Sequence, residues 1–112
     1  MALHVGCDLV FIPVFRERLG TAGDLLLDRI FHASERAGAS VESLAGRFAA
    51  KEAACKALGL PAGAWLELVI EHEPSGAPRV RFLEPRPGVR EIAVSITHAG
   101  DYAVAMVAVV RA

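Results

Sequence analysis

The pattern of apolar and polar positions changes from segment to segment along the chain, and it is most regular in residues 44–59. This segment is rich in Ala, Leu, Lys and Glu, the strongest helix formers, and it predicts one helix. Ser40 is suited to cap its first turn, and Gly59 followed by Pro61 is suited to end it. Bulky residues fall along one stripe and alanines along a second, so we expect this helix to be packed on both sides.

The remainder of the first half reads as one strand followed by short helices. Residues 3–12 form an apolar run of the kind found in a strand that is buried on both faces, and Pro13 is expected to end it. Three short helices are predicted at residues 14–19, at 25–31 with Asp24 as the cap, and from Glu35 with Ser34 as the cap.

The second half of the chain has the pattern of strands. Residues 65–72 and 79–83 flank a turn at 74–78, which predicts a β-hairpin. Residues 91–98 and 102–110 predict two more strands joined by a short turn. A strand, several helices and then a run of strands is typical of an α+β domain, here with an antiparallel sheet packed on the long central helix.

Composition narrows the class of protein. The 112 residues suit a single domain, and a hydrophobic fraction of 54% is too high for a disordered chain. No apolar run approaches the roughly 20 residues that a membrane span needs, so we expect no membrane insertion. The formal net charge of −1 lacks the basic footprint of a nucleic-acid binder. An apolar surplus on so small a chain suggests buried contacts between subunits.

Cysteine usage and the N-terminus indicate the compartment. Cys7 and Cys55 lie in a strand-like and a helix-like run and have no metal-binding spacing, so we interpret both as small core residues in a reducing compartment. No signal peptide is apparent, because a basic segment followed by a long apolar segment is missing at the start.

Four residues carry the candidate chemistry. Asp8 is an acid within an apolar run, where a carboxylate is costly unless it is paired or bound to a cation; alternatively it caps the next turn. Glu52 and Lys56 are four residues apart on the central helix, so they can point at one ligand or form a surface ion pair. His98 lies where a strand gives way to a turn and can be functional or merely structural.

Three segments taken together resemble the holo-acyl-carrier-protein synthase family of 4′-phosphopantetheinyl transferases. They are VGCDLVFI, RFAAKEAACKALG and VSITHAGDYAVAMV, in this order. The matching positions are Gly6 and Asp8 in the first segment, Phe48, Lys51, Glu52 and Lys56 to Gly59 in the second, and Ser95 and His98 in the third. The turn Gly76-Ala77-Pro78 is similar to a Gly-x-Pro turn of the family.

The resemblance implies a phosphopantetheinyl transferase fold and a defined reaction. The family transfers the 4′-phosphopantetheine arm of coenzyme A to a serine of an acyl carrier protein, as in fatty acid biosynthesis, with Mg²⁺ as cofactor and 3′,5′-ADP as product. Asp8 and Glu52 would bind the metal, and Glu52 and Lys56 would be catalytic, with Lys56 facing the pyrophosphate. The coenzyme A phosphates would have three candidate ligands: Arg47, Lys51 and His98. Glu52 or a metal-bound water would be the base, and the sequence does not choose between them.

The resemblance also implies partners. Arg16 and Arg18 resemble a basic helix that meets the acidic carrier protein, where complementary charge sets association rate and partner choice. Family members are commonly homotrimers with sites at subunit contacts, and they are cytoplasmic.

Three departures from the family pattern keep other functions open. Phe11 and Ala99 stand where the family usually has acids, and residues 84–90 form a short segment where a helix is usual. These changes favour a relative that binds coenzyme A without catalysis. A structural domain of a carrier-protein assembly, with a vestigial Asp8–Glu52 pair, is the other alternative. The presence of Asp8, Glu52 and Lys56 favours the enzyme.

Overall fold

The computed structural model describes all 112 residues and contains two antiparallel sheets and a set of helices. The elements in chain order are β1 (Ala2–Phe11), α1 (Ile12–Ala22), α2 (Asp24–Ile30), α3 (Ala33–Arg36), α4 (Val41–Leu58), the 3₁₀ turn η1 (Trp65–Glu67), β2 (Leu68–His72), β3 (Pro78–Phe82), β4 (Val89–Ala99) and β5 (Tyr102–Arg111).

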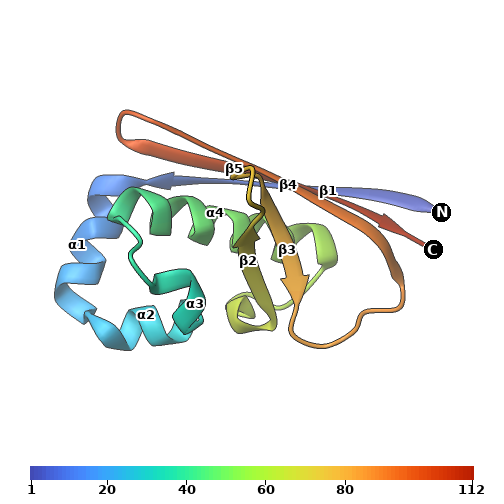
Figure 1. The fold of residues 1–112 in the computed structure, drawn as a ribbon, viewed down its shortest axis with the longest axis horizontal. Coiled ribbons are helices and arrows are strands. Elements are labelled where there is room, and N and C mark those ends of the chain that lie inside the picture. The colour runs from blue at the N-terminus through green and yellow to red at the C-terminus, as the bar shows by residue number, and fades with distance from the viewer.

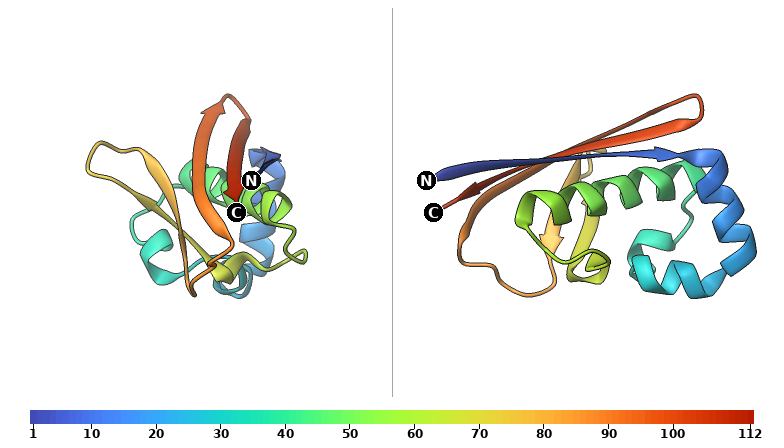
Figure 2. Two further views of the ribbon diagram at one scale, coloured as in Figure 1. Left: turned by 90° about the vertical axis from the view of Figure 1, so that its right-hand side faces the viewer. Right: turned by 180° about the vertical axis from the view of Figure 1, so that it is seen from behind.

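The long strands form one layer over α4. They make a three-stranded sheet in the order β1-β5-β4, and β2 and β3 form a separate two-stranded hairpin. In Figure 1 the three-stranded sheet lies along one side of α4. Helix α1 lies beyond the N-terminal end of α4, and α2 and α3 lie on the side away from the sheet. Figure 2 shows the same layering from behind. The predicted α+β class, the antiparallel pairing and the central helix are confirmed.

Helix α4 begins and ends where the sequence predicted. The hydroxyl oxygen of Ser40 accepts a hydrogen bond from the backbone N–H of Ser43 at 3.1 Å. Gly59 ends the helix in the left-handed conformation with φ of 68°, which glycine adopts without steric cost. Both sides of α4 are packed, because it contacts the three long strands on one side and α1, α3, η1 and β2 elsewhere.

Two glycines allow α4 to lie very close to the sheet. A Cβ on Gly6 of β1 would overlap the carbonyl oxygen of Ala53 and lie 2.9 Å from its carbonyl carbon. A Cβ on Gly46 of α4 would lie 2.8 Å from the side chain of Ile96 on β4. Gly46 weakens the helix locally, and this contact is the reason that the position tolerates no larger residue without a shift.

The prediction that β1 is buried on both faces is wrong for the single chain. Its inward face packs on α4, but the opposite face is open, with Leu3 67% and Leu9 60% exposed. Cys7 lies on this open face and is exposed, so it is not the core residue that we expected. The apolar residues on both faces produce the continuous apolar run that the sequence shows.

The short helices differ from the prediction at their ends. Helix α1 already begins at Ile12, so Pro13 lies in its first turn, where proline is tolerated, and does not merely end the strand. Asp24 is the first residue of α2 and makes no cap hydrogen bond. Helix α3 begins at Ala33 rather than at Glu35, whose carboxylate accepts a hydrogen bond from the backbone N–H of His32 at 2.8 Å. Ser34 therefore lies within the helix.

The second half follows the prediction with one change. The β2–β3 hairpin and the β4–β5 pair form as expected. Residues Trp65–Glu67, which we assigned to a strand, form the 3₁₀ turn η1, and β2 starts at Leu68.

None of the helices combines the length and the apolar character that crossing a membrane requires.

Candidate active site

A pocket of about 400 Å³ contains both predicted metal ligands. Asp8 from β1 and Glu52 from α4 line it together with Arg18 from α1. The rest of its wall is apolar and consists of Leu9, Val10, Phe11, Val14, Phe15 and Phe48. We refer to this as the carboxylate pocket. Two residues that are 44 positions apart by their numbers thus share one site, because Gly6 lets α4 lie against β1.

Lys56 neutralises the first of these carboxylates. Its Nζ lies 3.2 Å from Asp8 Oδ1 and donates a second hydrogen bond to the backbone carbonyl of Cys7 at 2.9 Å. Asp8 is therefore not the turn cap that was its alternative interpretation. The side chain of Lys56 remains 54% exposed, so its ammonium can reach a ligand that enters from solvent.

Glu52 has a different partner. Its Oε1 accepts a hydrogen bond from the indole N–H of Trp65 at 2.8 Å. No ion pair joins Glu52 to Lys56, so the simple i,i+4 pair that the spacing allowed is absent. Lys56 instead pairs with Asp8, and Glu52 lines the same pocket as Asp8.

The donor set of the carboxylate pocket fits Mg²⁺. Mg²⁺ keeps several waters and is commonly held by one or two carboxylates together with substrate phosphate oxygens. Asp8 and Glu52 supply two carboxylates. The chain has no cluster of three or more potential ligating side chains that would form a closed protein site, so oxygens from a phosphate substrate would complete the coordination.

A second pocket of about 450 Å³ contains Arg47 and His98. It is bounded by the start of α4, by β4 and by the turn between β2 and β3. Its other lining residues are Ser40, Glu42, Ser43, Gly46, His72, Gly76, Pro78 and Ile96. We refer to this as the hairpin pocket. It shares no lining residue with the carboxylate pocket.

The hairpin pocket brings together Arg47, His72, His98 and the carboxylate of Glu42. Arg47 donates through Nη1 to the backbone carbonyl of Glu35, and its buried Nε has no hydrogen-bond partner. Guanidinium groups bind phosphate oxygens through several parallel N–H groups. His72, which the sequence gave no reason to single out, lies in the same pocket as His98. Its place just before the Gly-x-Pro turn is the one signal that could have indicated this.

Lys51 lies in neither pocket. Its side chain is fully buried, and Nζ forms a 2.6 Å ion pair with Glu35 Oε1. The same Nζ lies within hydrogen-bond distance of the backbone carbonyls of Ile30, Trp65 and Leu68. Burial lowers the pKa of Lys51, and the contact with Glu35 acts in the opposite direction. With all its donors used internally, Lys51 is no longer a candidate for binding coenzyme A phosphates, and its role is structural.

Cys55 is excluded as a nucleophile. It is buried on α4, and burial raises the pKa of its thiol to about 11. Only the thiolate is an effective nucleophile, so Cys55 acts as a small apolar side chain, as the sequence indicated.

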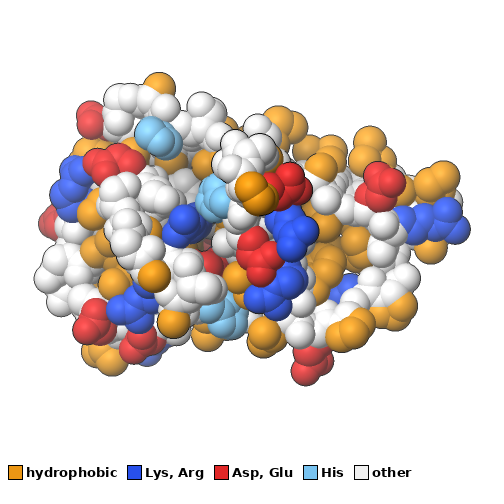
Figure 3. Space-filling view, viewed as in Figure 1, with side chains coloured by type: hydrophobic (Ala, Val, Ile, Leu, Met, Phe, Trp, Pro, Cys, Tyr) orange, Lys and Arg blue, Asp and Glu red, His pale blue; other side chains and the backbone are white.

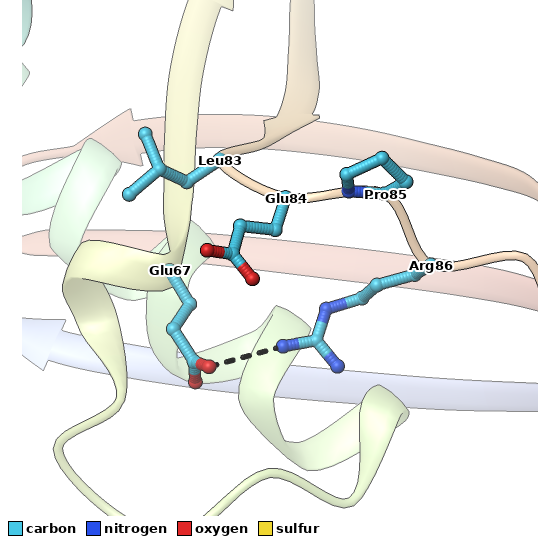
Figure 4. Close-up of a pocket in the computed structure, with 5 residues that line it drawn as sticks. All are labelled: Glu67, Leu83, Glu84, Pro85 and Arg86. Atoms are coloured by element: carbon cyan, nitrogen blue, oxygen red, sulfur yellow. Dashed lines mark hydrogen bonds and ion pairs between the residues drawn. The ribbon is translucent and has the colours of Figure 1, made fainter.

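The residues that depart from the family pattern lie in three different places, and only Phe11 lines the carboxylate pocket. Phe11 lines the carboxylate pocket and packs on Tyr102, with ring centroids 5.2 Å apart. Ala99 is exposed at the end of β4. The short segment after β3 closes a third pocket of about 340 Å³, in which Arg86 pairs with Glu67 at 3.3 Å (Figure 4). This third pocket contains none of the predicted site residues.

Comparisons with known proteins identify the family. The 4′-phosphopantetheinyl transferase superfamily profile matches residues 4–107. The chain belongs to this superfamily. It is similar to the holo-[acyl-carrier-protein] synthase of Salinispora arenicola, with 39% identity over 99% of this chain and 100% of the relative. The corresponding protein of Chlamydia pneumoniae is 35% identical over 92% of this chain and 93% of the relative.

Solved structures of the superfamily share the fold. The Helicobacter pylori holo-[acyl-carrier-protein] synthase in complex with coenzyme A has a TM-score of 0.88 at 28% identity and covers 95% of this chain and 99% of its own. The complex of the Chronobacterium ammoniagenes protein with coenzyme A has a TM-score of 0.87 at 30% identity and covers 100% and 99%. The resemblance read from the three sequence segments is therefore confirmed at the level of family and fold.

Proposed function

We propose that this chain is a holo-[acyl-carrier-protein] synthase. It transfers the 4′-phosphopantetheine arm of coenzyme A to a serine of an apo acyl carrier protein and releases 3′,5′-ADP. The observation that carries the proposal is that Asp8 and Glu52, from two elements, line one pocket, with Lys56 paired to Asp8. Relatives that match over nearly the whole chain carry this name, and related structures hold coenzyme A.

Asp8 and Glu52 are proposed to hold Mg²⁺. When bound, the ion would neutralise pyrophosphate oxygens and fix their position, which is the main contribution of metals to phosphoryl transfer. The protein supplies the two carboxylates and an otherwise apolar wall around them. Apolar side chains around the carboxylates lower the effective dielectric constant there, which strengthens their attraction for a cation.

Lys56 and Glu52 are the proposed catalytic residues. The serine oxygen attacks the phosphorus that bears pantetheine, and the bond from that phosphorus to the oxygen of 3′,5′-ADP breaks. The Lys56 ammonium, which is half exposed beside Asp8, offsets the negative charge that grows on the departing phosphate. Glu52 Oε2 takes no hydrogen bond from the protein and is the oxygen left for the cation; the serine proton would pass to Glu52 or to a water beside it.

The hairpin pocket is proposed to bind the phosphates at the nucleotide end of coenzyme A. Arg47 and His98 both line this pocket, as does His72. We assign the hairpin pocket and the carboxylate pocket of one active site to neighbouring subunits, because the family resemblance implies sites at subunit contacts.

A homotrimer is the proposed assembly. The outer face of the three-stranded sheet carries exposed apolar side chains from β1 and β5, namely Leu3, Val5, Leu9, Phe11, Tyr102 and Met106. In Figure 3, apolar side chains project along the edge that the sheet forms. A contiguous apolar patch of this kind is typical of an interface. Light scattering at micromolar concentration tests the assembly: three chains per particle are expected, and a monomer alone would contradict both the trimer and a site shared between subunits.

The acidic carrier protein is proposed to dock on α1. Arg16 is exposed and pairs with Glu42 at 2.9 Å, and Arg18 lines the carboxylate pocket. Complementary charge at this surface would speed the encounter and select acidic partners. Coenzyme A and carrier proteins are substrates of the cytoplasm, where we place the protein.

Release of 3′,5′-ADP tests the function. The wild-type chain, coenzyme A, Mg²⁺ and an apo carrier protein should release the nucleotide in proportion to carrier. A carrier with its acceptor serine replaced by Ala is the matched control and should give no release. Replacing Asp8 or Glu52 with Ala should abolish both turnover and metal binding. Release that persists in both variants would remove these residues from the site.

A further inference from the structure

Trp65 is the one side chain that fixes Glu52. Its Nε1–H donates to Glu52 Oε1 at 2.8 Å. The indole packs edge-on against Phe48, one turn before Glu52 on α4, with ring centroids 5.5 Å apart. Phe48 in turn stacks on Phe15 of α1 at 5.6 Å. The hydrogen bond is therefore held in place by a row of three aromatic rings.

The backbone of Trp65 is anchored from the opposite side. Its carbonyl oxygen accepts a hydrogen bond from the buried Nζ of Lys51 at 3.1 Å. Lys51 is held by Glu35, whose second oxygen accepts a hydrogen bond from the backbone N–H of Ile70 at 2.8 Å. A buried ion pair thus sets the position of η1, and η1 sets the position of the indole.

This arrangement determines which oxygen of Glu52 is available. A free glutamate samples many rotamers, and ordering it costs free energy whenever a cation binds. The indole occupies Oε1 and leaves Oε2 without a donor. Hydrogen bonds to metal-ligating carboxylates orient the ligand, and their removal typically lowers metal affinity 10–100-fold.

We propose that Trp65 is a positioning residue that orients Glu52 toward the metal, an inference that rests on the proposed function. Its side chain lines neither pocket, so it would act through Glu52. Lys51, which matches the family segment but lies outside both pockets, contributes by holding the backbone of Trp65. The chemistry of the pocket therefore depends on a residue that lies outside all three sequence segments.

The test uses Mn²⁺ as the probe, with coenzyme A present, and the variant Trp65→Phe. The phenyl ring keeps the packing on Phe48 but removes the N–H. We expect about tenfold weaker Mn²⁺ binding by electron paramagnetic resonance, an unchanged melting temperature and unchanged coenzyme A affinity. Turnover should recover as Mg²⁺ is raised. Glu67→Gln, which removes the exposed ion pair with Arg86 in the same turn, is the control and should leave Mn²⁺ affinity unchanged.

The outcomes separate this inference from the proposed function. Wild-type affinity for Mn²⁺ in Trp65→Phe would overturn the positioning role and leave the metal site intact. A lower melting temperature with unchanged Mn²⁺ affinity would overturn it as well, because the indole would then serve packing alone. A wild-type chain that binds no Mn²⁺ in the presence of coenzyme A would overturn the metal site itself, and the positioning role with it.

Discussion

Gly6 of β1 lies directly against the backbone of Ala53 on α4, with no room for a Cβ between them. Gly6 lies two residues before Asp8, and Ala53 lies one residue after Glu52, so this contact sets the separation of the two carboxylates. A motif residue with no side chain thus has a defined role in building the site.

Replacing Gly6 with Ala tests that role. The added methyl would overlap the Ala53 carbonyl and push β1 away from α4, because neither backbone can move independently of its own packing. We expect a loss of about 2–4 kcal/mol in the free energy of unfolding, together with weaker Mn²⁺ binding. Gly20→Ala is the matched control, since that position on α1 has open space around it. Equal stability of Gly6→Ala and wild type in urea denaturation would contradict the close packing.

Lys51 should behave as a structural residue. Lys51→Met removes the cation from a fully buried pair and leaves Glu35 unpaired, which typically costs about 3–5 kcal/mol. Urea denaturation measures this loss. In the fraction that remains folded, the KM for coenzyme A should be unchanged, because the side chain reaches neither pocket. A stable Lys51→Met variant with a raised KM would restore the phosphate-binding role that the sequence suggested.

The sequence predicted the helices and strands better than it predicted the tertiary contacts of individual side chains. The helix at 44–59, its caps and the hairpin follow from local propensity and turn chemistry, so they were predictable. The partner of a side chain is set by tertiary packing, and this explains the errors. Lys51 has the spacing of an exposed cation on α4, yet η1 and α3 cover it completely. Nothing in the local pattern distinguishes it from Lys56.

In the candidate site, too, some residues could be predicted from the sequence and others only from the tertiary structure. Asp8, Glu52 and Lys56 could be brought together from two sequence segments. In the structure Asp8 and Glu52 line one pocket, and Lys56 pairs with Asp8. Trp65 could not be found, because it reaches Glu52 only through a contact between distant elements. For His72 the only signal was its place before the Gly-x-Pro turn. The open face of β1 also escaped prediction, since an apolar run does not distinguish burial within a chain from an exposed apolar face.

Lys56→Ala should separate catalysis from metal binding. We expect kcat to fall about 10²–10³-fold, as for removal of a group that stabilises charge in the transition state. Mn²⁺ affinity should not decrease, because Asp8 loses a competing cation at 3.2 Å. Lys56→Arg retains the charge and serves as the comparison. Loss of Mn²⁺ binding in Lys56→Ala would show that the lysine instead maintains the geometry of the pocket.

Mixed oligomers test the sharing of the site. His98→Ala alone should raise the KM for coenzyme A, and Asp8→Ala alone should be inactive. If neighbouring subunits supply the two pockets, co-expressed variants should recover activity, because each mixed trimer contains one contact with both residues intact. His4→Ala, a histidine outside both pockets, is the control partner for His98→Ala. Activity that never exceeds the sum of the separate variants would place the whole site within one chain.

Intact-mass measurement of an apo carrier protein tests the central claim most directly. The carrier is incubated with the wild-type chain and coenzyme A before its mass is measured. With Mg²⁺ present, the carrier should gain the mass of one phosphopantetheine group. With the metal chelated, or with the acceptor serine replaced, its mass should not change. Tight coenzyme A binding without a mass gain on any acidic carrier tested would contradict the account and identify the chain as a non-catalytic member of its superfamily.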